Sequence, residues 1–260
     1  MKKVSIVYKK EDKLIAGTAK QLARELPSVF QFVADPKKAD FIITLGGDGT
    51  VLRAAHIISG QNIPLLAVHL GGLGLLTSSS LEELPCALES IKNKKYQIDS
   101  RLMLRVQVVR KNKIFKELVA LNDAVVCKND IARIIKLKAF LGEEKLGDYA
   151  ADGVIASTPT GSTAYNFAVN GPILPIHSKS YILSPICPHR ATDRSIVLED
   201  DITIKIVKGK DVLLTVDGQQ TLSLTSDDVV KIGVSKEKTS FIRFKKYDIW
   251  QLLRDKLGWG

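Results

Sequence analysis

The first 95 residues alternate short apolar runs with amphipathic stretches. Apolar residues spaced by threes and fours predict helices over residues 14–26 and 50–59. Continuous apolar runs predict buried strands at residues 4–8, 41–45 and 65–68. Strands that are apolar on both faces and alternate with helices are typical of a parallel sheet in a doubly wound layer. We therefore predict an α/β domain over residues 1–95.

A further helix is predicted after the third of these strands. Ser80 and Glu83 have the spacing of a capping box, in which each residue satisfies the backbone N–H of the other at a helix start. Pro85 is expected to disturb the early turns of this helix.

After Lys95 the pattern changes to short strands with few long helices. Asp217 followed by Gly218 is a strong hairpin signal, and one helix is expected near residues 163–169. We predict a β-rich domain over residues 96–239, with the amphipathic tail at 240–260 packing back on the first domain. The strands are predicted at residues 102–110, 114–121, 131–140, 154–156, 195–198, 202–207, 212–216 and 229–234.

Composition narrows the class of protein. The 260 residues carry a formal net charge of +10, which favours anionic partners. Aromatic residues make up only 6% and the lysines are spread along the chain, so a nucleic-acid partner is not expected. Cys86, Cys127 and Cys187 are widely spaced and form no C-x-x-C pair, which indicates reduced thiols in a cytoplasmic protein. No apolar run approaches the roughly 18 residues of a membrane helix, so no membrane partner is expected.

A glycine-rich loop, GGDGT at residues 46–50, joins an apolar strand to a helix. Gly46, Gly47 and Gly49 would let the backbone approach phosphate oxygens at the positive end of the helix dipole, with Thr50 following. The loop lacks both the P-loop lysine and the G-x-G-x-x-G dinucleotide fingerprint. Asp48 would repel phosphate unless it binds a cation or accepts a proton, so it is the candidate catalytic residue. The alternative is a tight turn in which Asp48 caps the helix.

The GGDGT loop resembles the motif shared by NAD kinases with diacylglycerol and sphingosine kinases. Further segments resemble NAD kinases in particular: Asn122 and Asp123 after Leu121, the fourteen residues DGVIASTPTGSTAY at 152–165, the residues NGPI at 170–173, the residues SPICPH at 184–189 and the residues VDGQ at 216–219. A turn at Asn122, a well-capped helix start with Tyr165 in the core, and a surface turn at Asp152 are the structural alternatives.

The resemblance implies a two-domain kinase with the substrate in a cleft between the domains. The activity that the resemblance implies is phosphorylation of the adenosine ribose 2′-hydroxyl of NAD, with ATP or polyphosphate as donor and Mg²⁺ or another divalent metal. It also implies a homodimer or homotetramer, and no protein side chains are assigned as metal ligands. Carried over by position, the phosphate-donor loop comprises Gly46, Gly47, Gly49 and Thr50, Asp48 is catalytic, and the residues that contact NAD are Asp48, Gly49, Arg53, Asn122, Asp123, Arg133, Asp152, Thr163, Ala164, Tyr165, Asn166, Phe167, Ala168 and Gln219.

Two features bear on the acceptor and the assembly. A lipid kinase would need an apolar groove, whereas the hydroxyl-rich residues 158–165 suit a nucleotide better.

Asp152 is separated from Thr163 by the length of a strand, at about 3.3 Å per residue. Because the resemblance also implies sites that are shared between subunits, we expect Asp152 to complete the site of a neighbouring subunit. Four positions depart from the family pattern, and these departures affect the expected positioning of the substrate but not the expected reaction. They are Asn170, His69, Leu75 and Gly72.

Overall fold

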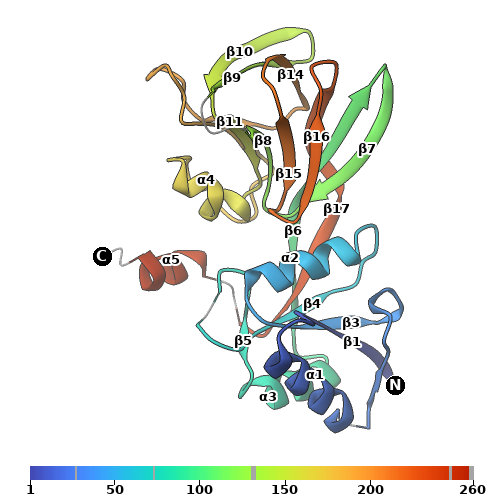
Figure 1. Ribbon diagram of the computed structural model, residues 1–260. Helices are drawn as coiled ribbons and strands as arrows, with labels where there is room; N and C mark the ends of the chain where they lie inside the picture. The colour runs from blue at the N-terminus through green and yellow to red at the C-terminus, as the bar shows by residue number, and fades with distance from the viewer. Residues whose placement is uncertain (27, 73, 130–132, 246–247, 258–260) are drawn as a thin grey trace. The chain divides into compact units, whose positions relative to one another are not determined.

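The computed structural model describes residues 1–26, 28–72, 74–129, 133–245 and 248–257. It divides into two compact units, residues 1–100 with 239–260, and residues 101–238. The first unit is α/β and the second is β-rich, so the predicted fold class is confirmed (Figure 1). Strands β6 (Gln97–Arg110) and β17 (Val229–Arg243) each run across a boundary between the units.

A parallel sheet forms the centre of the first unit. Its hydrogen-bonded order is β2-β1-β3-β4-β17, and β5 also pairs with β4. The parallel pairing follows from the apolar strands buried on both faces. The strands β1 to β5 span Lys2–Tyr8, Phe30–Phe32, Phe41–Leu45, Leu65–His69 and Ser79–Ser80.

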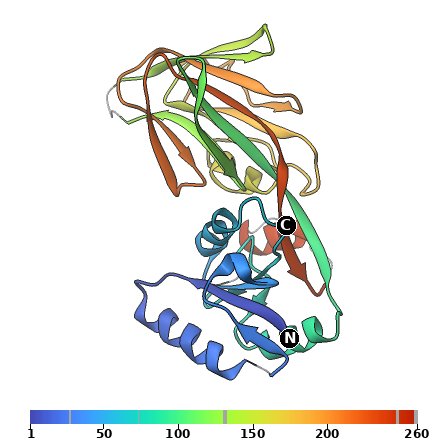
Figure 2. The ribbon, with the colours of Figure 1, turned by 90° about the vertical axis from the view of Figure 1, so that its right-hand side faces the viewer.

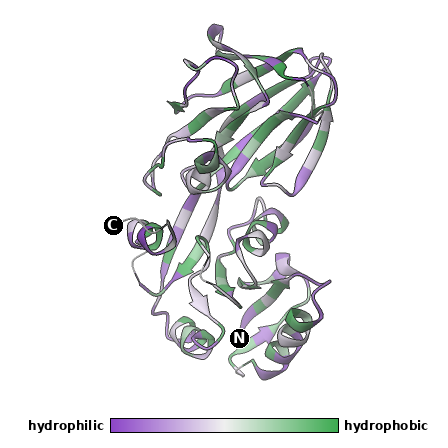
Figure 3. Cartoon of the chain, turned by 60° about the vertical axis from the view of Figure 1, so that its left-hand side comes forward, coloured by the Kyte–Doolittle hydropathy of each residue, from purple (hydrophilic) through white to green (hydrophobic). Residues whose placement is uncertain are grey.

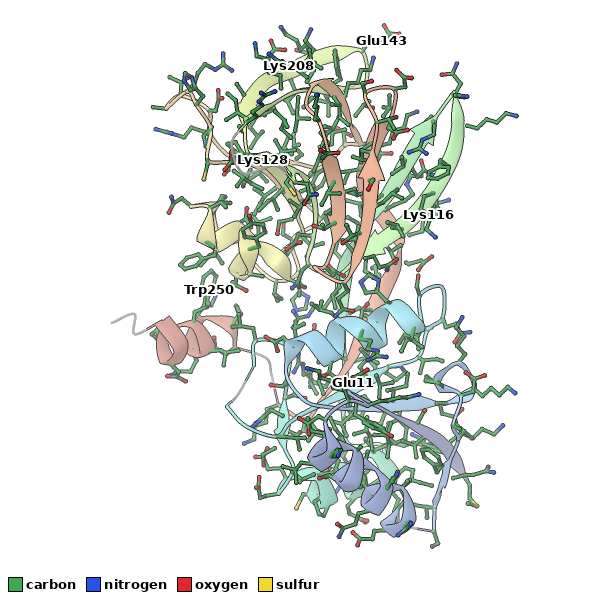
Figure 4. All side chains as sticks on the ribbon, in the orientation of Figure 1. Glu11, Lys116, Lys128, Glu143, Lys208 and Trp250 are labelled. Atoms are coloured by element: carbon green, nitrogen blue, oxygen red, sulfur yellow. The ribbon has the colours of Figure 1, made fainter. Side chains whose placement is uncertain are left out.

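Helices cover both faces of this sheet. Helices α1 (Lys13–Glu25) and α3 (Leu84–Lys92) lie on one face, and α2 (Asp48–Ile57) lies on the other (Figures 1 and 2). Phe41, Ile43 and Leu45 pack with residues of α1 and α3, as expected for alternate side chains of one strand. The helical elements η1 and α5 span Pro36–Lys38 and Ile249–Leu257, and the side chain of Trp250 in α5 is exposed (Figure 4).

The predicted capping pair is present, but the helix begins after it. Glu83 accepts a bond from the backbone N–H of Ser80 at 2.9 Å, and the N–H of Glu83 donates to Ser80 Oγ at 3.3 Å. Helix α3 starts at Leu84, with Pro85 in its first turn. Proline is tolerated there because the first N–H groups of a helix have no intrahelical partner.

The second unit is built on antiparallel ladders. One sheet has the order β13-β12-β11-β8-β15-β16, and the other joins β10-β9-β14-β17 with the pair β6 and β7. Hydrophobic and hydrophilic residues alternate along these strands (Figure 3), and the apolar side chains form one large core. The strands β7 to β16 span Lys113–Ala120, Asp123–Lys128, Ile135–Leu141, Glu144–Ala151, Gly153–Ser157, Tyr181–Ile186, Ile196–Leu198, Ile202–Lys208, Val212–Val216 and Gln220–Leu224.

The hairpin at Asp217 and Gly218 is confirmed. Both residues have positive φ, 51° and 62°, as a type I′ turn requires, and they join β15 to β16. The helix expected at 163–169 is reduced to η2 (Gly161–Thr163) and the short α4 (Tyr165–Ala168). The start of the segment predicted at 131–140 lies outside the described residues, and β9 covers only its second half.

Several strands were not predicted, and β12 shows why. It contains Pro185, which cannot donate a ladder hydrogen bond. Pro185 pairs with Val154 of β11, but the pairing with β13 covers only residues 181–183. Pro185 therefore needs no second ladder partner. The other unpredicted strands are β2, β5, β8, β10 and β16.

Positive side chains of the second unit are distributed over separate strands. Lys116, Lys128 and Lys208 belong to β7, β8 and β14 (Figure 4). Within the described ranges, the longest apolar helical stretches are too short to cross a membrane.

Candidate active site

The glycine loop places an uncapped helix start at the end of β3. Gly46 has φ 142°, and a Cβ there would lie 2.6 Å from Thr50 Oγ1. Gly47 is the N-cap of α2 and makes no side-chain capping bond, and Gly47 and Gly49 are both exposed. A Cβ at either of these two would meet nothing within 4 Å. The loop therefore leaves room for an oxyanion beside the helix N-terminus.

The carboxylate of Asp48 is held by a second loop. Its Oδ2 accepts the N–H of Leu75 at 2.9 Å, and its Oδ1 accepts the N–H of Leu76 at 3.0 Å. Asp48 is the first residue of α2, so the alternative that it caps this helix is wrong. Because Leu75 contributes only its backbone here, its departure from the family pattern leaves this contact intact.

The 74–76 backbone approaches Asp48 very closely. A Cβ built on Gly74 would lie 2.1 Å from Asp48 Oδ1 and 3.0 Å from Thr77 Oγ1. The N–H of Gly74 also donates to Thr77 Oγ1 at 2.8 Å. Only glycine fits this position, so the loop and the carboxylate fix each other. Arg53 is exposed on the same helix, and Thr50 is half-buried.

In the second unit, the turn that carries Asn122 and Asp123 is fixed by Asp217. The carboxylate of Asp217 accepts the N–H groups of Leu121, Asn122 and Asp123 at 2.8, 2.7 and 3.0 Å. The side-chain oxygen of Asn122 is buried, and within the described ranges it has no hydrogen-bond donor. Buried polar atoms are normally satisfied, so this oxygen is available to a donor from a bound molecule.

Asp123 is a buried carboxyl group beside another one. Burial, and after it the charge of Asp217, raises the pKa of Asp123 to about 7. Near neutral pH this group therefore exchanges between an acceptor and a hydrogen-bond donor.

The hydroxyl-rich segment packs directly on this turn. The N–H of Thr158 donates to Asn122 O at 2.8 Å, and Thr158 Oγ1 donates to Leu121 O at 2.6 Å. A Cβ on Gly161 would lie 2.1 Å from Asn122 O. These contacts place residues 158–161 next to Asn122.

Tyr165 is 46% exposed, so the alternative that it lies in the core is wrong. Its pKa is raised by partial burial first, and then by the nearby thiols and the carboxylates of Asp123 and Asp152. Asp152 pairs with Lys128 Nζ at 2.7 Å. The chain turns into η2 after Pro159, and the charge of Asp152 contributes to the raised pKa of Tyr165 in the same chain. The argument from strand length therefore fails, because it assumed an extended chain.

The remaining predicted residues differ in what they offer. Asn166 is fully buried, and its Nδ2 donates to Ser162 O and Pro172 O while its Oδ1 accepts Ser184 Oγ. This side chain therefore supports the segment rather than presenting free atoms. The others are half-buried at Thr163, Ala164 and Phe167 and exposed at Ala168, Arg133 and Gln219.

Comparison with known proteins identifies the family. Residues 4–96 match the ATP-NAD kinase N-terminal domain, and residues 121–244 match the ATP-NAD kinase C-terminal domain. An NAD kinase of Geobacter metallireducens is 38% identical over 281 residues, which cover 100% of this chain and 99% of that protein. The chain belongs to the NAD kinase family. The prediction of a kinase that phosphorylates NAD to NADP is thereby confirmed.

Further NAD and NADH kinases resemble this chain in sequence or in fold. An NAD kinase of Caldanaerobacter subterraneus subsp. tengcongensis is 41% identical over 223 residues, covering 85% of this chain and 79% of that protein. Yeast NADH kinase, solved with NADH, has the same fold, with a TM-score of 0.86, 23% identity and coverage of 100% and 88% of the two chains. An NAD kinase from Archaeoglobus fulgidus, solved with ATP, gives a TM-score of 0.79 at 24% identity and covers 98% of both chains.

Sequence reasoning missed the residues that hold the 74–77 loop and the Asn122 turn in place. Asp217 was assigned to a hairpin and to the VDGQ segment that resembles a family element, but its hydrogen bonds to the turn 94 to 96 residues before it were not predicted. Gly74, Thr77 and Arg243 were given no role. A buried charge has no signature in the local pattern, because its partners come from distant strands.

Asp123 predicts a pH dependence of stability. With its pKa raised from 3.8 to about 7, the folded protein keeps a proton that the unfolded chain has released. Stability is therefore lost as the pH rises from about 4 to about 7. At 1.36 kcal/mol per pKa unit, the loss is at most about 4 kcal/mol.

Urea unfolding without NAD at about pH 5 and about pH 8 tests this. Asp123→Asn cannot titrate, so its unfolding free energy should change less between the two pH values than that of the natural protein. Equal changes in both proteins would assign the dependence to other groups.

Proposed function

We propose that the protein transfers the γ-phosphoryl group of ATP to the 2′-hydroxyl of the adenosine ribose of NAD, with Asp48 acting on that hydroxyl. The observation that supports this most directly is the carboxylate of Asp48, held by two backbone N–H groups beside an exposed glycine loop. A carboxylate kept in one orientation next to a phosphate-binding turn suits the in-line approach of a hydroxyl group.

The donor is assigned to the glycine loop. Gly46, Gly47, Gly49 and Thr50 surround the N-terminus of α2, where the helix dipole favours phosphate oxygens. Phosphoryl transfer has a loose transition state, so positioning and charge neutralisation dominate. Asp48 therefore accepts the hydroxyl proton late, or orients the hydroxyl in line, and need not be a strong base.

The nucleoside is assigned to Asn122, Asp123 and Tyr165. Oδ1 of Asn122, which has no donor among the described residues, can accept an amine or hydroxyl, and Asp123 can bond ribose hydroxyl groups. The exposed ring of Tyr165 offers an aromatic surface to a base. Asp152, in electrostatic range of Tyr165, adds a second carboxylate to the same region. Arg53, Arg133, Gln219 and residues 163–168 stay predictions as further contacts.

Mg²⁺ would be bound mainly by the phosphate groups of the donor. Within the described ranges, no group of three or more His, Cys, Asp or Glu side chains is gathered to hold a metal. Mg²⁺ is usually bound by substrate phosphates together with one or two carboxylates, and Asp48 is the carboxylate of the loop. When bound, Mg²⁺ neutralises charge on the phosphate oxygens. Polyphosphate as donor, a homodimer or homotetramer, and a cytoplasmic location stay predictions.

The position of the transferred phosphate tests this proposal. The protein is incubated with NAD, ATP and Mg²⁺, and the product is analysed by ³¹P and ¹H NMR. We expect phosphorus coupling to the 2′ proton of the adenosine ribose. Parallel reactions replace NAD with a diacylglycerol vesicle or ATP with polyphosphate. Phosphate on another hydroxyl group, or faster transfer to the lipid, would contradict the proposed acceptor.

A further inference from the structure

A buried arginine stands behind the loop that holds Asp48. Arg243 is the last residue of β17 and is 3% exposed. Its Nε donates to Asp99 Oδ2 at 3.3 Å, and its Nη1 and Nη2 donate to Thr77 O and Leu76 O at 3.3 and 3.2 Å. A buried guanidinium group needs such partners, because an unpaired charge in the interior is strongly destabilising.

One loop connects this arginine to Asp48. Leu76 accepts from Arg243 through its carbonyl and donates to Asp48 Oδ1 through its N–H. The adjacent N–H of Leu75 donates to the other carboxylate oxygen. The carbonyl and the N–H of Leu76 are attached to the same Cα atom, so a shift of the Leu76 backbone away from Arg243 also displaces the N–H that bonds Asp48.

We propose that Arg243 is a positioning residue for phosphoryl transfer, holding the backbone of residues 75–77 so that the N–H groups of Leu75 and Leu76 orient the carboxylate of Asp48. This rests on the role proposed for Asp48. Asp99 compensates the charge of Arg243 and fixes one end of the guanidinium group. All of these contacts lie within the first unit. Loss of Arg243 should therefore lower kcat and leave NAD affinity nearly unchanged.

Arg243→Lys is the first test variant. Lysine keeps the positive charge but lacks the planar fork that reaches Asp99 and two carbonyl groups together. We expect kcat at saturating NAD and ATP to fall by more than about fivefold, since small displacements of a reacting group cost up to about 10²-fold. The dissociation constant of NAD, measured by calorimetry, should change less than about twofold. Asp99→Asn tests the same assembly if Arg243→Lys does not fold.

Two further measurements separate positioning from general stability. In an Asp48→Asn background, Arg243→Lys should lower the residual rate less than about twofold, because the group it positions is already lost. The amide ¹⁵N signals of Leu75 and Leu76 should shift in both Asp48→Asn and Arg243→Lys. Arg110→Met is the matched control, since Arg110 binds Asp228 through two bonds of 2.7 and 2.8 Å in the second unit.

Different results would contradict the positioning role of Arg243 and the role proposed for Asp48. A folded Arg243→Lys protein with kcat within about fivefold of the natural protein removes the positioning role. The same conclusion follows if the rate falls equally in the natural and Asp48→Asn backgrounds, or if Arg110→Met has as large an effect on kcat. If Asp48→Asn alone stays active, the role proposed for Asp48 fails instead, while the amide shifts still report whether Arg243 holds the loop.

Discussion

Asp48→Asn is expected to keep the fold and nearly abolish phosphoryl transfer. Asparagine has the size of aspartate, but an NH₂ group replaces one of the two carboxylate oxygens. Because an NH₂ group cannot accept a hydrogen bond, one of the two bonds from the N–H groups of Leu75 and Leu76 is lost. The substitution thus removes the proton acceptor and disturbs the loop that orients it. Loss of a general base typically costs about 10² to 10⁴-fold. Steady-state assays with saturating NAD and ATP measure the effect on kcat.

The control for this experiment is Asp40→Asn. Asp40 lies in the same unit, just before β3 and at the opposite end of that strand from the glycine loop, and its exposed carboxylate accepts the N–H of Lys3 at 2.6 Å. Circular dichroism should show both variants folded, and only Asp48→Asn should be inactive. If Asp48→Asn kept more than about a tenth of the natural kcat, Asp48 would not have the assigned role.

Gly74→Ala is expected to have the next largest effect. The added methyl group would lie 2.1 Å from Asp48 Oδ1 and 2.9 Å from its carboxyl carbon, closer than any real contact. Either the carboxylate turns away or the 74–76 backbone retreats, and both movements break the bonds from Leu75 and Leu76. A displacement of about 1 Å at a reacting group costs up to about 10²-fold, so kcat should fall by about 10 to 10²-fold.

Gly72→Ala provides a control from the same loop. A Cβ at Gly72 would meet no atom within 4 Å, so this variant should retain its kcat. Thermal unfolding of both variants separates a lost orientation from a lost fold. Equal activity of Gly74→Ala and the natural protein would show that Asp48 does not need the geometry seen here.

Features of the fold that depend on neighbouring residues could be predicted from the sequence. The apolar run Phe41–Leu45 followed by GGDGT predicted a buried strand and a helix start, because hydrophobic period and glycine content act over a few residues. The hairpin at Asp217 and Gly218 was predicted for the same reason, since its positive φ angles favour these residue types. The strands Phe30–Phe32 and Glu144–Ala151 escaped prediction because only a few of their residues are buried, which leaves a weak hydrophobic pattern.

The sequence by itself determined the fold class, the family and the location of the phosphate-binding loop in the chain. Only the tertiary structure decided how the candidate site is held together. Asp48 binds amides 27 and 28 residues away, Asp217 binds the Asn122 turn 95 residues before it, and Arg243 reaches a carbonyl 167 residues before it. Such bonds depend on which strands become neighbours in a sheet. Sheet order arises from the packing of the whole chain, and no local period or propensity encodes it.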